Sequence, residues 1–443
     1  MTLPSLLSAS QPVRPSACPG LLRIVTAMDG GICRVKLDAG VITATQALAI
    51  AEVSQRYASG VLEATNRCNL QIRGVGDQHR ELIEPLLAVG LGPKTAAGDE
   101  VRNVMLSPTA GLDPHMKIDM RPLANQVLAS LQSIPRLAEL SAKFAIQLDG
   151  GEALAMLEHP HDLWLSATER EGEIVLAFGL AGCPAHDMAL GAVPIEQGHA
   201  LVMAVLLLFL DTARPDQMRM RHLLEGISTE DFVQRLAQRL SIALLTLPTW
   251  QREAAVVGGH IGTYPQRDQH HVCVGAVPAL GRLNAATLSA LAHLAAEFGD
   301  STLRFTPWQS VLLPNVSVDD AHALTLKLQT LGLICDQSQP LAHVVACTGS
   351  NACAKGLADT KQDARQLAAL LSQPHPIHLT GCSRSCAAAH VAPVTLLAVA
   401  PGHYDLYLRH SEQPGFGVLC ERNLTIEAAS AWFEARQRSN TND

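Results

Sequence analysis

The chain of 443 residues contains an internal repeat, which restricts its architecture more than any other feature. The segment Ile42–Val75 aligns without a gap to the second half of the chain at an offset of 241 residues, which places Thr43 on Asn284 and Val75 on Val316. Each copy begins with a helix N-cap residue, continues with apolar residues at helical spacing, and ends in an alternating strand. Another strand candidate precedes each copy. Because such units pack helices on a mixed sheet, the sequence predicts an α+β chain of two pseudo-equivalent halves.

The segments that follow the two copies also correspond in outline. Each contains a turn-rich stretch, a helix, a strand that enters a glycine-rich loop, and further strands. We therefore expect two small half domains, residues 18–80 and 250–320, and two larger α/β domains, residues 95–245 and 340–435. The first larger domain should end in a largely helical bridge over residues 198–247. Its apolar run Ala200–Leu210 is shorter than the ~20 residues that cross a bilayer, so it should be a buried helix.

Composition and charge are those of a soluble enzyme. The chain is 48% hydrophobic and 17% charged, and its net charge of −8 argues against a nucleic-acid-binding protein, whose charge is usually positive and clustered. The N-terminal stretch lacks the features of a secretory signal, so we expect a cytoplasmic protein with reduced thiols and no membrane contact. Seven of the 11 cysteines are scattered and are expected to pack as small buried groups: Cys18, Cys33, Cys68, Cys183, Cys273, Cys335 and Cys420.

The other four cysteines form two pairs in the second half. Cys347 and Cys353 lie in "ACTGSNACAKG", and Cys382 and Cys386 lie in "HLTGCSRSCAAAH". These spacings fit neither the tight knuckles of structural zinc nor the ferredoxin C-x2-C-x2-C run. Four thiolates on two separated loops suit a [4Fe–4S] cubane, in which each iron takes one protein sulfur, and the neighbouring glycines would let the backbone come close. A zinc site and four buried free cysteines remain alternatives.

Several motifs resemble those of the nitrite and sulfite reductase superfamily over roughly residues 18–410. The C-x5-C…C-x3-C spacing lies on the second half of a duplicated chain, as it does there. The stretch "EATNRCNLQIRGV" resembles the superfamily's Thr-x-Arg strand, which lies against a tetrapyrrole, and "NVMLSPTAGLDP" resembles its Asn-Val-x-x-x-Pro-x-Ala-Gly-x-Asp segment. The resemblance implies two ferredoxin-like half repeats and two cluster-type α/β domains. It implies that only the second such domain carries a cluster, a [4Fe–4S] group on the four paired cysteines.

Within this superfamily the chain is most similar to the precorrin-3B synthases of aerobic cobalamin biosynthesis. The stretches "RPSACPGLLRIV", "LRFTPWQSVLL" and "GCSRSCAAAHVAP" carry this likeness. It implies a monooxygenase that uses O2 to hydroxylate precorrin-3A at C20, while a ring A acetate closes a γ-lactone. An additional mononuclear non-haem iron is also implied, and His378 and His390 are near enough to the cysteines in sequence to be considered, although neither is assigned. Because no dinucleotide fingerprint is present, electrons should come from an external donor.

A macrocycle with eight carboxylates needs several cationic side chains to bind it. The expected carboxylate-binding residues come from both halves: Arg67, Arg73, Lys143, Arg304, Lys355 and Arg384. Arg102 and Lys117 are weaker candidates. The chain departs from the reductases at two places, because Ala145 stands where they resemble one another in a second lysine, and Cys68 stands where they carry glutamine. Losing a cation argues against the six-electron reduction of a small oxyanion.

Two other functions remain open at this point. The chain could be a sirohaem-dependent sulfite or nitrite reductase that has lost one cation. It could also be a non-catalytic electron-transfer protein that keeps the [4Fe–4S] cluster and has no catalytic cleft.

Overall fold

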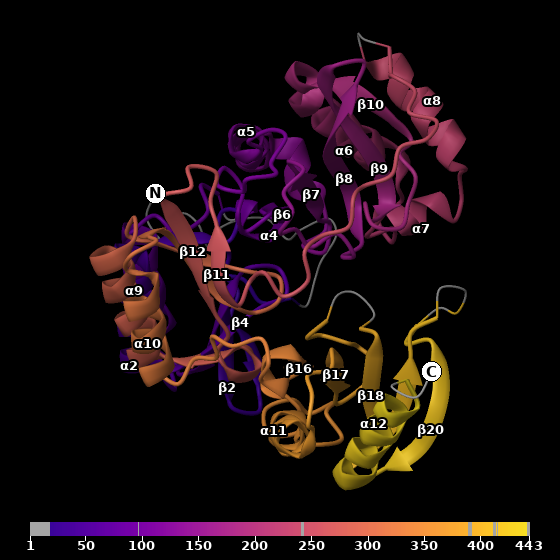
Figure 1. The fold of residues 1–443 in the computed structure, drawn as a ribbon. Helices are drawn as coiled ribbons and strands as arrows, with labels where there is room; N and C mark the ends of the chain where they lie inside the picture. The colour runs from indigo at the N-terminus through magenta and orange to yellow at the C-terminus, as the bar shows by residue number, and fades with distance from the viewer. Residues whose placement is uncertain are drawn as a thin grey trace.

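The computed structural model describes residues 18–95, 97–240, 243–388, 392–410, 413 and 415–440. Its strands form four five-stranded sheets (Figure 1). The first small sheet contains β1 (Val25–Ala27), β2 (Gly30–Val35), β4 (Val61–Ala64), β5 (Leu70–Val75) and β13 (Arg282–Asn284). The second contains β11 (Gly262–Pro265), β12 (His271–Ala276), β14 (Thr302–Phe305), β15 (Val311–Ser317) and β3 (Val41–Thr43).

The internal repeat is confirmed in the elements themselves. Strands β2, β3 and β4 and helix α2 (Ala44–Tyr57) recur 241 residues later as β12, β13, β14 and α9 (Ala285–Phe298), with identical lengths. Both helices start at the expected caps, because the Thr43 side chain accepts a hydrogen bond from Gln46 N at 3.2 Å and the Asn284 side chain accepts one from Thr287 N at 2.7 Å. The next helix also recurs, as α3 (His79–Ala88) and α10 (Ala321–Thr330).

The two small domains exchange a strand. Strand β13 of the second repeat pairs with β4 of the first, with Leu283 opposite Leu62. Strand β3 of the first repeat pairs with β14 of the second, with Ile42 opposite Leu303. Helices α2 and α9 pack against one another, and a single hydrophobic core runs through both repeats. Each small sheet is therefore complete only when both halves of the chain are present.

The two larger domains share one sheet topology. In the first, β6 (Val104–Leu106), β7 (Ile146–Asp149) and β8 (His161–Arg170) run parallel, and β9 (Glu173–Gly182) and β10 (Gly191–Pro194) follow antiparallel. In the second, β16 (Val344–Ala346), β17 (Ile377–Thr380) and β18 (Val394–Ala400) run parallel, and β19 (His403–Leu408) and β20 (Val418–Leu424) follow antiparallel. The helices of the second are α11 (Thr360–Leu370) and α12 (Ile426–Asn440).

Five α-helices belong to the first larger domain in the described residues. They are α4 (Gly98–Val101), α5 (Arg121–Ser133), α6 (Gly198–Thr212), α7 (Met220–Leu224) and α8 (Thr229–Arg239). Short 3-10 turns occur at Pro135–Glu139, Ile195–Gln197, Ala279–Gly281 and Pro340–His343. Within the described residues, Ile195–Thr212 is the one helical segment long and apolar enough to be a membrane span, but half of it is buried in the protein. Helix α6 is thus a core helix of the first larger domain, packed on α5 and α8.

Candidate functional site

The two cysteine loops follow neighbouring parallel strands, so their first residues meet at one edge of the sheet. Cys347 follows β16 and Cys382 follows β17 by two residues. The Cys347 sulfur accepts a hydrogen bond from Gly381 N at 3.2 Å, and Cys347 N donates to Leu379 O at 3.2 Å. An amide that donates to a sulfur is a common way in which a protein tunes an iron–sulfur cluster.

Glycines allow the two loops to approach this closely. Gly349 has φ +71°, and a Cβ there would lie 2.7 Å from Ala358 O. A Cβ on Gly356 would lie 2.6 Å from the Gly349 carbonyl carbon, and one on Gly381 would lie 3.0 Å from the Gly356 Cα. No side chain larger than hydrogen fits at the first two positions without a shift of the backbone. The predicted close approach at Gly349 and Gly381 is confirmed, and Gly356 completes it.

The four thiols act on one another electrostatically. Cys386 is the most accessible of them, yet burial of its thiol and then the charges of Cys382, Cys347 and Cys353 raise its pKa. None of the four is in a disulfide. Within the described residues no three Cys, His, Asp or Glu side chains converge closely enough to hold one metal ion. A cubane takes one sulfur on each of four irons, and its positive irons would offset the repulsion between thiolates, so these residues fit a [4Fe–4S] cluster.

Turns from both repeats lie against the second cysteine loop. Asn66, in the turn between β4 and β5, donates to Cys386 O at 3.4 Å. Gln309, in the equivalent turn between β14 and β15, donates to Ala387 O at 3.0 Å. The equivalence extends to backbone conformation, since Cys68 and Gln309 occupy corresponding positions and both have positive φ, 57° and 63°. The predicted tetrapyrrole-facing turn therefore lies beside the cysteines.

A cluster of basic side chains surrounds the first of these turns. Arg67 is half-buried, and burial followed by the charge of Arg219 lowers its pKa to about 10. The charge of Arg34 lowers it further. Arg34, on β2, also lies near enough to Cys386 for that thiol to influence its pKa, and it hydrogen-bonds to Cys18. We call Arg34, Arg67 and Arg219 the basic cluster.

Two buried residues of β8 support the basic cluster. Asp162 accepts hydrogen bonds from Arg219 Nε at 2.9 and 2.8 Å and from Met220 N at 2.8 Å, which fixes the start of α7. His161 hydrogen-bonds through Nδ1 to His159 O at 2.8 Å. Burial, and then the charge of Arg67, lower the pKa of His161 to about 3, so it is a neutral imidazole at physiological pH.

Ala145, where the resemblance to the reductases led us to expect a second cation, lies beside the same carboxylate. Ala145 is 2% exposed, and its backbone N–H donates to Asp162 Oδ2 at 2.8 Å. Lys143, two residues earlier, is exposed. The carboxylate of Asp162 thus joins the Ala145 backbone to the Arg219 guanidinium.

The other expected carboxylate-binding residues differ in their surroundings. Arg73 pairs with Asp29, with Nη2 to Oδ1 at 2.7 Å, and Arg304 Nη1 donates to Pro108 O and Ala110 O, both at 3.0 Å. Because these two guanidinium groups have partners inside the protein, we do not include them in the proposed substrate-binding set. Lys355 and Arg384 are exposed on the cysteine loops, where their role stays a prediction.

The weaker candidates for carboxylate binding, Arg102 and Lys117, differ in exposure. Arg102 is buried between Asp38 and Asp99, whereas Lys117 is exposed. His378 is buried within β17, and His390 lies outside the described residues.

Two members of the basic cluster were absent from the residues that the sequence singled out. Arg34 lies on an alternating strand and Arg219 lies in the helical bridge, and neither has a local motif. Cys18, expected to be a packing residue, is half-buried beside Arg34 instead. One partial indication of this region was present in the sequence, because the stretch that contains Cys18 resembles a family signature. Cys68 does pack as expected, against Met105 and Met156.

In the first larger domain, polar residues occupy the loops equivalent to the cysteine loops. After β6, Asp113 is fully buried and accepts hydrogen bonds from Tyr264 OH at 2.9 Å and Leu154 N at 3.2 Å. After β7, Glu152 is fully buried, and burial followed by the charge of Asp149 raises its pKa to about 8. Arg252 pairs with Asp149, with Nε to Oδ2 at 2.7 Å. A hydrogen-bonded network of side chains therefore fills this part of the first half.

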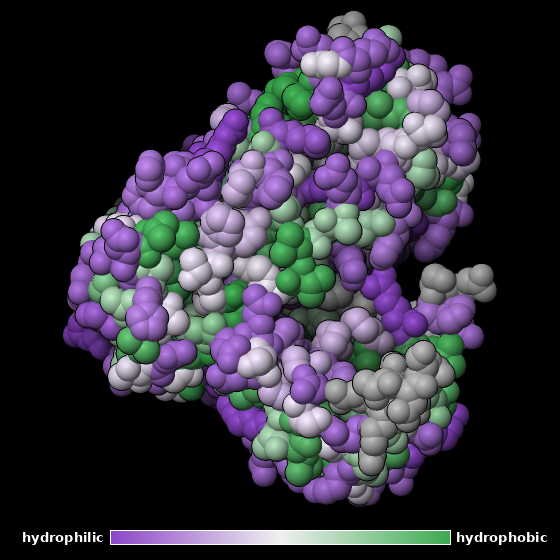
Figure 2. Space-filling model, viewed as in Figure 1, coloured by the Kyte–Doolittle hydropathy of each residue, from purple (hydrophilic) through white to green (hydrophobic). Residues whose placement is uncertain are grey.

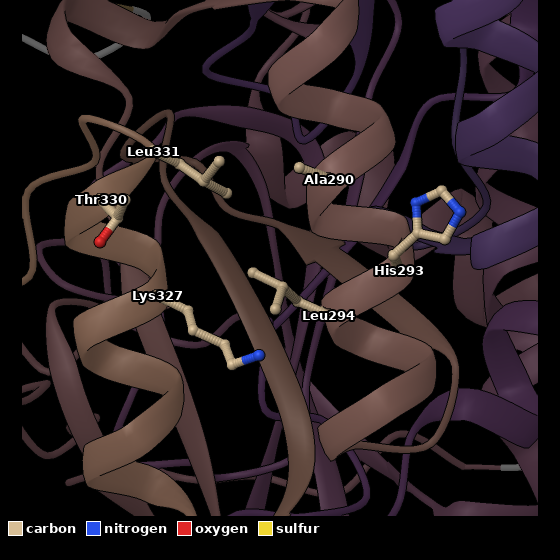
Figure 3. Close-up of a pocket in the computed structure, with 6 residues that line it drawn as sticks. All are labelled: Ala290, His293, Leu294, Lys327, Thr330 and Leu331. Carbon is tan, nitrogen blue, oxygen red and sulfur yellow. The ribbon is translucent and has the colours of Figure 1, made fainter.

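The surface is hollowed between the two larger domains, on the face that Figure 2 shows. An ion pair between Arg409 and Glu158, 2.9 Å apart, joins the two larger domains. Another cavity, of about 400 Å³, lies between α9 and α10, and Figure 3 shows Leu294 and Lys327 facing it from the two helices. Its described lining residues include none of the cysteines and none of the basic cluster, so it is separate from the candidate site.

Comparisons with known proteins identify the family. The ferredoxin–nitrite reductase of maize (Zea mays chloroplast) is 31% identical over 394 residues, which cover 82% of this chain and 68% of the maize protein. The chain belongs to the nitrite and sulphite reductase family. The family's ferredoxin-like half domain matches residues 27–89 and 264–331, and its 4Fe-4S domain matches residues 97–244, a region in which Cys183 is the one cysteine of the sequence.

Two further relatives show how far the family likeness extends. The precorrin-3B synthase of a Sinorhizobium species is 24% identical over 398 residues, which cover 89% of this chain and 83% of that protein. The structure of the Mycobacterium tuberculosis NirA protein covers 92% of this chain and 80% of its own, at 20% identity and a TM-score of 0.76. The predicted superfamily and its duplicated α+β architecture are confirmed. The chain spans about two thirds of the length of the plant nitrite reductases it matches.

Proposed function

We propose that this oxidoreductase is a precorrin-3B synthase, an O2-dependent monooxygenase of cobalamin biosynthesis that hydroxylates precorrin-3A at C20 with closure of a γ-lactone. The observation that carries the proposal is Ala145. Reduction of a small oxyanion needs concentrated positive charge, and the position of the second cation is a buried methyl group whose backbone bonds to Asp162. The match over 83% of a precorrin-3B synthase supports the same reading.

The basic cluster would bind the macrocycle through its carboxylates. Arg34 lies on β2 and Arg67 lies in the turn between β4 and β5, both in the first small sheet, and Arg219 comes from the first larger domain. Guanidinium groups on separate elements can engage different carboxylates of one poly-acid, which orients the ring as well as holding it. Asp162 would keep Arg219 in place. His161 stays neutral beside them, so it adds no further charge.

The four cysteines would hold the [4Fe–4S] cluster beside this binding surface. The cluster would supply single electrons from an external donor. The reaction would need two electrons and two protons, because one oxygen atom would enter the C20 hydroxyl and the other would leave as water. Within the described residues no three-residue metal site is present, so we assign no ligands to a mononuclear non-haem iron.

A sirohaem-dependent nitrite or sulfite reductase is the second candidate. Its support is the 31% identity to the maize enzyme, together with the Thr65–Arg67 turn beside the cysteines. In that case the macrocycle would be a resident prosthetic group, and Ala145 would mean a smaller positive charge at the anion site.

Anaerobic purification followed by two assays separates the candidates. We expect iron and sulfide in a cluster ratio, no sirohaem on extraction, and conversion of precorrin-3A when O2 and a reductant are supplied. With labelled O2 the label should enter the C20 hydroxyl, while both lactone oxygens should derive from the ring A acetate. Extracted sirohaem together with nitrite or sulfite reduction would establish the second candidate instead.

A further inference from the structure

A buried carboxylate joins three domains next to the cysteine loops. Glu63, on β4, is 8% exposed and accepts from Arg282 Nη2 at 2.7 Å and from Arg73 Nη1 at 3.5 Å. Thr348 Oγ1 donates to Glu63 Oε2 at 3.3 Å, and Lys361 Nζ lies 3.7 Å from Oε1. Arg73 belongs to the first repeat, Arg282 to the exchanged strand of the second, and Thr348 and Lys361 to the cysteine-bearing domain.

Lys361 is arranged as a charged ammonium. Its Nζ donates to Leu280 O at 2.8 Å and to Ala346 O at 3.2 Å, and Glu63 Oε1 lies 3.7 Å away, within ion-pair distance. An ammonium has three donors and no acceptor, so two carbonyl acceptors and a nearby carboxylate favour the protonated form. Burial lowers the pKa of Lys361, and the charge of Glu63 opposes that effect.

This network reaches the first pair of cysteines directly. Thr348 follows Cys347, and Thr360, the residue before Lys361, donates to Cys347 O at 2.7 Å. The charge of Lys361 interacts with Cys347, and that of Arg73 with Cys353. Because these groups are buried, solvent and salt screen their charges little.

We propose that Glu63 and Lys361 set the reduction potential of the cluster through their opposite charges. The inference rests on the proposed cluster, and it concerns the electrons rather than the substrate. Reduction adds one negative charge to the cluster, so a nearby cation raises the potential and a nearby anion lowers it. The negative charge of Glu63 offsets part of the positive charge of Arg73, Arg282 and Lys361, and its contacts also hold these three side chains in place.

The test is a redox titration of the substrate-free protein, followed through the signal of the reduced cluster. K361M should lower the potential and E63Q should raise it, each changing the ratio of reduced to oxidised cluster at least tenfold at fixed potential, which is 59 mV for a one-electron couple. E52Q is the matched control, because Glu52 forms an ion pair with Arg56 in which both side chains are more than 60% exposed. It should leave the potential unchanged.

The experiment tests the inference even if one variant fails to assemble its cluster. Shifts of the same sign, or no shift beyond that of E52Q with iron and sulfide intact, would overturn it. If E63Q loses its cluster, the pair K361M and K361R decides, since arginine should restore the potential and an identical value in both variants would refute the charge effect. A protein that carries the cluster but does not convert precorrin-3A would leave this inference standing.

Discussion

Arg67 and Trp308 occupy equivalent positions in the two repeats, yet one presents a guanidinium and the other an aromatic ring. Trp308 stacks on His260, with ring centroids 4.7 Å apart and planes 2° from parallel, and it packs on Cys68 beside Arg67. The two pseudo-symmetric turns therefore carry side chains of different chemistry. The charged turn faces the first larger domain, and its partner closes the interface between the halves.

Replacing any one of Cys347, Cys353, Cys382 or Cys386 by serine should abolish or degrade the cluster, because serine is a far poorer ligand for iron than a thiolate. The measurement is iron and acid-labile sulfide per chain after anaerobic purification, with the visible spectrum. Cys273→Ser is the control, since Cys273 is fully buried and contacts Gln266. It should retain full iron, and full iron in any of the first four variants would refute the assignment.

Arg67→Ala should weaken tetrapyrrole binding by about 1.5–3 kcal/mol if its charged hydrogen bond to a carboxylate is buried. Titration of the macrocycle by absorbance or calorimetry measures this loss. Lys143→Ala, at an exposed residue, should have a smaller effect that shrinks as salt rises. Arg56→Ala, at an exposed position outside the site, serves as the control. Equal affinity for a fully esterified macrocycle would contradict carboxylate recognition.

Ala145→Lys should not create sulfite reduction, because under the proposed function no sirohaem is present to bind the anion. It should also destabilise the protein, since the new ammonium would replace a methyl group that is 2% exposed. Thermal unfolding and a sulfite reduction assay measure the two effects. Sulfite turnover by this variant, with sirohaem in the wild type, would favour the reductase.

Glu152 should make stability fall as pH rises. Its folded pKa of about 8 lies above the ordinary value of 4.5, so the folded state holds a proton that the unfolded state releases between those values. The free energy of unfolding should therefore decrease by about 1.4 kcal/mol per pH unit across this range, and level off above it. Glu152→Gln should remove this slope. Denaturant unfolding at several pH values tests it, and identical slopes in both proteins would show that Glu152 ionises normally.

The sequence predicted the elements of the fold well where the signal was local. The caps at Thr43 and Asn284 and the helical periodicity behind them defined α2 and α9. The exchange of β3 and β13 was not predictable, because these strands have three residues each and pair with partners far away in the sequence, with Leu283 opposite Leu62 and Leu303 opposite Ile42. The glycines near the cysteines predicted the contact between the two loops. Two backbones that approach closely need glycine there, however far apart the loops lie in the sequence.

The candidate site was predictable in its cysteines and only partly in its cations. Arg67 is in a motif, whereas Arg34 and Arg219 join it through tertiary packing alone. Arg73 illustrates the converse. Its partner Asp29 lies in the turn between β1 and β2 and its partner Glu63 lies on β4, where Val61 pairs with Arg73, so tertiary structure brings them together. A lone arginine on a strand does not reveal whether a carboxylate of the protein already satisfies it.

The exchanged strands also determine when each small sheet can finish folding as the chain leaves the ribosome. The first small sheet lacks its edge strand until Arg282–Asn284 emerges, and β3 has no partner until Thr302–Phe305 follows. At about 5–20 residues per second, that wait is on the order of tens of seconds. During it, β4 presents an open sheet edge to other nascent chains, and such edges favour aggregation. A fragment that ends before residue 282 should therefore depend on chaperones, and supplying residues 250–443 in trans should rescue its solubility.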